Sequence, residues 1–191
     1  SFPTVCGHEF SGTIEALGPG VEEYAVGDRV TVFPLLWCGK CAPCELGNYV
    51  QCEDYDYYGS RRHGAFAQYL SVPTQNLVRV PDGVSLEAAS MTEPAGVALH
   101  AAKRAGGSFV GESVVIFGAG PIGLMTAQWV RMMGAQQVIL FDLVPEKLAM
   151  AEKLGFRLVF NPREVDPIQK IRDLTAGYGA EVCIEGAGVP I

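Results

Sequence analysis

Short apolar stretches alternate with turns along the first part of the chain. Turns such as Gly18-Pro19-Gly20 and Pro81-Asp82-Gly83 separate segments that combine apolar and polar residues over a few positions. Short segments of this kind between turns are typical of β-strands. Residues 1–93 are therefore predicted to form an antiparallel β domain, with strands over Gly12–Leu17, Asp28–Phe33, Phe66–Val72 and Leu77–Val80.

From Ser85 onward, apolar strands alternate with helices. A helix is predicted over the Ala-rich stretch Leu86–Arg104. Further helices, which have proline in their first turn or glycine after their last, are predicted over Pro121–Met133 and Pro145–Leu154 and from Asp166-Pro167. Strands are predicted over Val114–Phe117, Val138–Phe141, Leu158–Phe160 and Val182–Ile184. This order is typical of an α/β domain with a doubly wound parallel sheet, here over residues 94–191. Such sheets usually contain further strands, so we expect an internal segment of a longer protein, with both domains incomplete.

Composition narrows the possible partners. The 191 residues carry 14 Lys and Arg against 21 Asp and Glu, a net charge of −7, which argues against binding to nucleic acid or anionic membranes. The uncharged stretch Ser113–Val130 is interrupted by glycines and polar residues, so it is not expected to span a membrane. No signal-peptide pattern follows Ser1, and we expect a cytoplasmic protein.

A glycine-rich motif follows the first predicted strand of the α/β domain. Gly118, Gly120 and Gly123 fit G-x-G-x-x-G, with Pro121 and Ile122 opening the helix, and these residues are expected to hold a pyrophosphate. Asp142 ends the next strand, where a carboxylate accepts the ribose hydroxyls of NAD and repels the extra phosphate of NADP. Lys147 could reach the same side of the cofactor. The structural alternatives are a glycine turn with a capping aspartate, and a solvated lysine.

Four cysteines indicate a metal site. Cys38, Cys41, Cys44 and Cys52 lie within fifteen residues, enough for a tetrahedral site of four thiolates in a lobe over residues 37–53. Such a site has no open position for substrate, so the predicted role is structural zinc. An iron–sulfur cluster and two disulfides are the alternatives.

Four further residues are weaker candidates for a functional site. His8 lies in Gly7-His8-Glu9, and Glu93 precedes Pro94 at the junction of the two domains. In a regular strand, adjacent residues face opposite ways, so Glu9 would point away from a metal bound by His8 unless the backbone is irregular. Cys6 would share the face of His8, although a small buried side chain is the favoured interpretation. By spacing alone, Glu93 is no better a candidate than any acidic residue that is stabilised by the dipole at a helix N-terminus.

Together these features resemble the zinc-dependent medium-chain dehydrogenase family. The residues that carry the resemblance run through the whole chain and include Gly7–Gly12, Val26–Val30, the cysteine lobe, Glu93-Pro94 and Gly118–Gly123. Within the family, the chain is most similar to the polyol branch, sorbitol dehydrogenase and its relatives.

The resemblance implies a GroES-like catalytic domain beside a Rossmann domain, NAD as hydride acceptor, and a catalytic zinc in the cleft between them. It places a zinc ligand at His8, and at Glu9 and Glu93 residues that bind the zinc or hold its water. The family's remaining ligand, a cysteine, is expected upstream of Ser1. Activity is therefore expected of the parent protein and not of this segment alone.

The implied substrate is a small polyol or a sugar-alcohol phosphate, and the implied assembly is a homodimer or homotetramer. As a hypothesis, Arg61 and Arg62 supply positive charge for a substrate phosphate; a solvated loop pair is the alternative. Other possible functions are a zinc alcohol or threonine dehydrogenase of the same family, an NADP-dependent reductase of the same fold, and an inactive zinc-braced NAD-binding module. Asp142 and the cysteine lobe disfavour the NADP-dependent reductase.

Overall fold

A computed structural model describes residues 4–188, and the chain divides into two compact units, residues 1–93 and 94–191. The outermost residues of the two predicted domains, 1–3 and 189–191, lie outside the described part. No helix among residues 4–188 combines the length and apolar character needed to cross a membrane.

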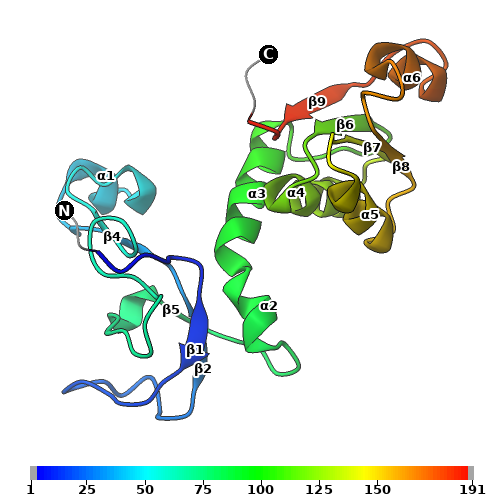
Figure 1. Cartoon of the computed structure of the whole chain (residues 1–191). Helices are drawn as coiled ribbons and strands as arrows, with labels where there is room; N and C mark the ends of the chain where they lie inside the picture. The colour runs from blue at the N-terminus through cyan, green and yellow to red at the C-terminus, as the bar shows by residue number, and fades with distance from the viewer. Residues whose placement is uncertain (1–3, 189–191) are drawn as a thin grey trace. The chain divides into compact units, whose positions relative to one another are not determined.

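Two small antiparallel sheets form the framework of the first unit (Figure 1). One has the strand order β1-β2-β5, and the other pairs β3 with β4. The strands are β1 (Ser11–Thr13), β2 (Arg29–Val32), β3 (Leu35–Leu36), β4 (Asp56–Tyr57) and β5 (Leu77–Arg79). The prediction of antiparallel strands is confirmed for this unit, although the strands are shorter than expected.

A buried asparagine fixes the chain between the two sheets. The side-chain amide of Asn76, which ends the short 3₁₀ helix η2 (Thr74–Asn76), donates to the carbonyls of Phe33 and Leu35, at 2.7 Å each. Asn76 is fully buried, where an unmade hydrogen bond would be costly. It therefore holds the link from β2 to β3 in one conformation. Pairing of β3 with β4 then closes residues 37–55 into a loop that contains α1 (Ala42–Glu45) and η1 (Tyr49–Gln51).

The prediction of a strand over Phe66–Val72 is wrong. These residues form bends and irregular backbone. The Phe66 amide donates to the Cys6 carbonyl and the Ser71 carbonyl accepts from the Tyr58 hydroxyl, but the stretch forms no ladder with any described strand. Phe66 and Tyr69 are 80% and 66% exposed, so the apolar residues do not gather on one buried face. Burial of such a face is what stabilises a strand with alternating polarity.

The predicted helix over Leu86–Arg104 is two helices, α2 (Leu86–Ser90) and α3 (Thr92–Arg104). The break is at Met91, and the Thr92 hydroxyl donates to the Ala89 carbonyl. Pro94 explains the break, because proline has no N–H for a helical bond and its ring clashes with the carbonyl four residues earlier. Proline is tolerated in the first turn of α3, where amides have no partner within the helix.

The second unit contains the predicted parallel sheet, in the order β8-β7-β6-β9. Its strands are β6 (Ser113–Phe117), β7 (Gln137–Phe141), β8 (Leu158–Phe160) and β9 (Val182–Glu185), and its further helices are α4 (Pro121–Met132), α5 (Pro145–Lys153) and α6 (Pro167–Leu174). Figure 1 shows these helices against the sheet. The fold class is confirmed: a β domain followed by a Rossmann-type α/β domain.

Both faces of the central strands β6 and β7 are buried. Side chains of β6 and β7 pack with α4 and α5 in one cluster, which includes Ile116, Leu140 and Val130. Their neighbours Val115 and Ile139 pack in a second cluster that includes Ile171 of α6. Successive strand residues face opposite ways, so a strand buried on both faces is continuously apolar, as β6 and β7 are after their first residues, Ser113 and Gln137.

Close backbone contact predicts different effects of alanine at two glycines of α4's N-terminus. A Cβ on Gly123 would lie 1.8 Å from the Gly118 carbonyl oxygen, whereas a Cβ on Gly120 would meet no atom within 4 Å. In urea denaturation, we expect Gly123→Ala to lower the free energy of unfolding by about 1–3 kcal/mol. Gly120→Ala is the matched control and should change it by less than about 0.5 kcal/mol. Equal effects would contradict the proposed packing of helix on strand.

Candidate metal and dinucleotide sites

The loop between β3 and β4 brings the four predicted cysteines together. The sulfur atoms of Cys38, Cys41, Cys44 and Cys52 all lie within 4.8 Å of one another. Cys41 and Cys52 are 4.0 Å apart at Sγ, and the amide of Cys38 donates to Cys52 Sγ at 3.2 Å. All four are free thiols, so the disulfide alternative is not what the fold forms.

This cluster fits zinc. Zn–S bonds of about 2.3 Å in a tetrahedron place sulfur atoms about 3.8 Å apart, so a small contraction would complete the site. Leu46 and Val50 of the lobe are 78% and 71% exposed, so the lobe has little apolar core of its own. A metal in the centre would supply the cohesion that the side chains do not.

Two of the thiols have opposite pKa shifts. Backbone hydrogen bonds, chiefly from Lys40 and also from Cys41, lower the pKa of Cys38 to about 7. Burial raises the pKa of Cys44 to about 12. Of these two thiols, Cys38 therefore forms the thiolate first, and a cation is needed to hold Cys44 as a thiolate at neutral pH.

A second cluster joins His8, Glu9 and Glu93, whose ligand atoms lie within 4.8 Å of one another. His8 Nε2 is 4.0 Å from a Glu9 carboxylate oxygen, and both side chains are partly exposed. Glu9 lies at a bend outside any strand, which is the irregular backbone that allows both side chains to face one site. One imidazole and two carboxylates form a donor set that suits zinc. Cys6 is exposed and outside this cluster, so its prediction as a buried side chain is wrong.

Tyr57 also contacts this cluster, although no motif in the sequence predicts a role for it. Its hydroxyl donates to Glu93 Oε1 at 3.3 Å, and its ring lies edge-on to His8 at 5.5 Å between centroids. Burial, followed by the neighbouring Glu93 carboxylate, raises the pKa of Tyr57 to about 12, so the phenol remains a donor at neutral pH. Tyr57 lies 36 residues before Glu93, and no spacing motif connects the two.

The glycine-rich motif lies between β6 and α4, as predicted. Gly118 has a φ of +100°, and a Cβ there would be 2.6 Å from the Ala187 amide nitrogen. Beside Gly120 the space is open, and Pro121 occupies the first helical turn. The first amides of a helix have no partners within it, and an open approach to them suits a pyrophosphate. The loop therefore fits a dinucleotide.

Asp142 links this loop to the end of β7. One carboxylate oxygen accepts from the Ala119 amide at 2.7 Å and the other from the Val144 amide at 2.8 Å. Lys147 Nζ lies 3.7 Å from Oδ2. Each carboxylate oxygen has two lone pairs, so Asp142 can still accept from ribose hydroxyls while it holds the loop.

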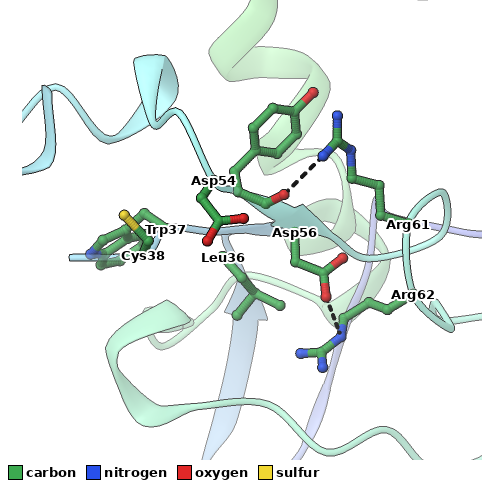
Figure 2. A pocket seen from close by; sticks show the side chains of 8 residues that line it. Leu36, Trp37, Cys38, Asp54, Asp56, Arg61 and Arg62 are labelled. Atoms are coloured by element: carbon green, nitrogen blue, oxygen red, sulfur yellow. Dashed lines mark hydrogen bonds and ion pairs between the residues drawn. The ribbon is translucent and has the colours of Figure 1, made fainter. Parts of the chain in front are cut away.

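Arg61 and Arg62 lie beside an open pocket that also contains Trp37 and Asp54 (Figure 2). Arg61 donates to the Tyr55 carbonyl and stacks on the Tyr55 ring, and Arg62 Nε is 3.0 Å from Asp56 Oδ2. The charge of Arg62 is therefore balanced by Asp56. Asp56 and Tyr57 are adjacent in β4 and so face opposite sides, which places the Arg62–Asp56 pair away from the Tyr57–Glu93 contact.

Two family models match the chain: an alcohol dehydrogenase GroES-like domain over residues 1–82 and a zinc-binding dehydrogenase over residues 121–191. Among curated relatives, galactitol 1-phosphate 5-dehydrogenase of Escherichia coli K12 is 40% identical over 189 residues, 99% of this chain and 54% of the relative. Sorbitol dehydrogenase of Bacillus subtilis is 38% identical (98% and 53% covered), and L-threonine 3-dehydrogenase of Symbiobacterium thermophilum is 37% identical (98% and 53% covered). The chain thus spans about half the length of these relatives.

Solved structures have the same fold. One from Sinorhizobium meliloti 1021, described as a zinc-binding dehydrogenase bound to NADP, is 33% identical with a TM-score of 0.90. The alignment covers 99% of this chain and 56% of that one. The likeness therefore extends through both units.

The pKa shifts in the lobe predict which thiol reacts first after zinc is removed with a chelator. Alkylation of Cys38 by iodoacetamide should rise through a midpoint near pH 7, because the thiolate is the reactive form. Cys44 should react at least about tenfold more slowly at pH 8, because its pKa of about 12 keeps it protonated. Mass spectrometry of the labelled peptides measures both rates. Restored zinc should protect both thiols, and indistinguishable pH profiles would contradict the assigned hydrogen bonds.

Proposed function

The chain belongs to the zinc-dependent medium-chain dehydrogenase family, and on this premise we propose that its parent protein oxidises a polyol or polyol phosphate with NAD. The observation that carries the proposal is the convergence of His8, Glu9 and Glu93 on one site, together with a glycine loop that fits a dinucleotide. The similarity to galactitol 1-phosphate 5-dehydrogenase supports a sugar-alcohol phosphate such as galactitol 1-phosphate as substrate.

His8 and Glu93 would hold a catalytic zinc, with Glu9 as a third ligand or as the residue that orients a water. When bound, zinc supplies Lewis-acid chemistry that lowers the pKa of a substrate hydroxyl, and the nicotinamide accepts the hydride. Tyr57 occupies Oε1 of Glu93, which leaves the other carboxylate oxygen as ligand or proton acceptor. The loop Gly118–Gly123 and Asp142 would bind the pyrophosphate and the adenosine ribose.

The cysteine lobe would carry a second, structural zinc, because its four thiols leave no coordination position for substrate. Its contribution is the fold of residues 37–53 and not the reaction. A homodimer or homotetramer is the proposed assembly.

Oxidation of threonine is a second candidate reaction, supported by a curated relative of nearly equal identity, L-threonine 3-dehydrogenase. The two substrates differ in charge. Threonine brings an ammonium and a carboxylate, whereas a polyol phosphate brings only an anion. The initial rates with galactitol, galactitol 1-phosphate, sorbitol and threonine, measured side by side, distinguish the candidates.

Replacement of the proposed ligands should abolish the reaction but leave the zinc of the cysteine lobe bound. In the full-length protein, we expect His8→Ala and Glu93→Gln each to lower kcat/KM at least about 100-fold, since the Lewis acid is worth several kcal/mol. Elemental analysis should show the loss of one zinc, with the lobe zinc retained. His100→Ala is the matched control, because His100 is exposed on α3 and outside the cluster. Full activity of His8→Ala would refute the proposed catalytic site.

Charge at Asp142 should determine the choice of cofactor. We expect Asp142→Ala to raise the Kd for NAD by about 10–100-fold, since hydrogen bonds to a charged group are worth about 1.5–3 kcal/mol. The same change should narrow the difference between the Kd values for NADP and NAD, because the carboxylate no longer repels the 2′-phosphate of NADP. Glu146→Gln removes a nearby exposed charge and is the control. Calorimetric titration with both cofactors provides the test, and an unchanged preference would argue against NAD specificity through Asp142.

A further inference from the structure

We propose that Tyr57 is a positioning residue, whose hydroxyl holds the Glu93 carboxylate in place beside His8. The inference rests on the proposed metal role of His8 and Glu93 and deepens it. It assigns the geometry of that site to a side chain that is not a ligand itself.

One side chain connects two of the three proposed ligands, which come from distant parts of the chain. His8 precedes β1, Glu93 lies in the first turn of α3, and Tyr57 lies in β4. The Tyr57 hydroxyl is 3.3 Å from Glu93 Oε1, and the edge of its ring packs against His8 at an interplanar angle of 61°. Tyr57 thus limits the conformations of both ligands at once.

Tyr57 itself is firmly anchored through its backbone. Its amide donates to Asp56 Oδ1 at 2.8 Å, and its carbonyl accepts from the amides of Arg61 and Arg62 at 3.0 and 3.2 Å. Tyr57 also pairs with Leu35 of β3. A residue held at both backbone groups presents its side chain from a fixed origin, which is what a support for ligands requires.

The hydrogen bond restricts the Glu93 carboxylate. With Oε1 engaged by a phenol, the carboxylate does not rotate freely, and its other oxygen stays open to a ligand. A free glutamate side chain loses considerable rotamer freedom when it is fixed, and a partner that fixes it beforehand removes that cost from metal binding. Residues that orient ligands in this way typically contribute 10–100-fold to metal affinity or activity.

The test is Tyr57→Phe, which removes the hydroxyl and keeps the ring against His8. Tyr55→Phe is the matched control, because the Tyr55 ring stacks on Arg61 instead. The full-length protein, with both sites loaded with Co²⁺, is titrated against a chelator while the visible absorption bands of each site are followed. We expect Tyr57→Phe to raise the Kd of the His8–Glu93 site for Co²⁺ by about 10–100-fold and to change its absorption spectrum. The thiolate bands of the lobe and the melting temperature should stay as in Tyr55→Phe.

A double-mutant cycle shows whether Tyr57 acts through Glu93. In a Glu93→Asp background, the shortened carboxylate no longer reaches the hydroxyl, so Tyr57→Phe should cause no further loss of Co²⁺ affinity. An equal Kd for wild type and Tyr57→Phe, or an equal further loss in the Glu93→Asp background, would overturn the positioning role. Co²⁺ bound only by the lobe in the wild type would instead overturn the proposed catalytic site, and the inference with it.

Discussion

The first unit depends on one short contact, the pairing of the two-residue strands β3 and β4. Leu35 and Leu36 pair with Tyr57 and Asp56, and the buried Asn76 amide holds the strand that leads into this pair. The pairing closes the cysteine lobe on one side and fixes the backbone of Tyr57 on the other. A short ladder of this kind has little strength by itself, so the buried hydrogen bonds of Asn76 are essential to it.

In the second unit, close contact between backbone atoms determines the shape of the glycine loop. Gly123 approaches the Gly118 carbonyl so closely that no side chain fits, and Gly118 needs a positive φ. Gly120 has no such neighbour, and the space beside it is open to a ligand. The three glycines of one motif therefore serve helix packing, the turn and ligand approach separately.

Much of the fold and of the candidate sites could be predicted from the sequence, because the signals lie within short stretches of the chain. The cysteine spacing and the glycine motif act over a few residues, and the central strands β6 and β7 are almost continuously apolar because both of their faces are buried. The failures have long-range causes. Alternation over Phe66–Val72 does not reveal that no partner strand covers Phe66 and Tyr69, and nothing near Tyr57 indicates that it meets a glutamate 36 residues later. Only the resemblance to the family joined His8, Glu9 and Glu93, since residue types alone left each with an ordinary alternative.

The closed base of the cysteine lobe makes it a separate unit of local unfolding. Its exposed Leu46 and Val50 contribute little to the main core, and its ends are clamped by β3 and β4. Loss of the metal would therefore make brief openings of the lobe more frequent, which accelerates its amide hydrogen exchange and its proteolysis, while the strands at its base stayed paired. In this way, oxidative damage to the cysteines can be confined to one surface loop, and Tyr57 keeps its place beside the His8–Glu93 cluster.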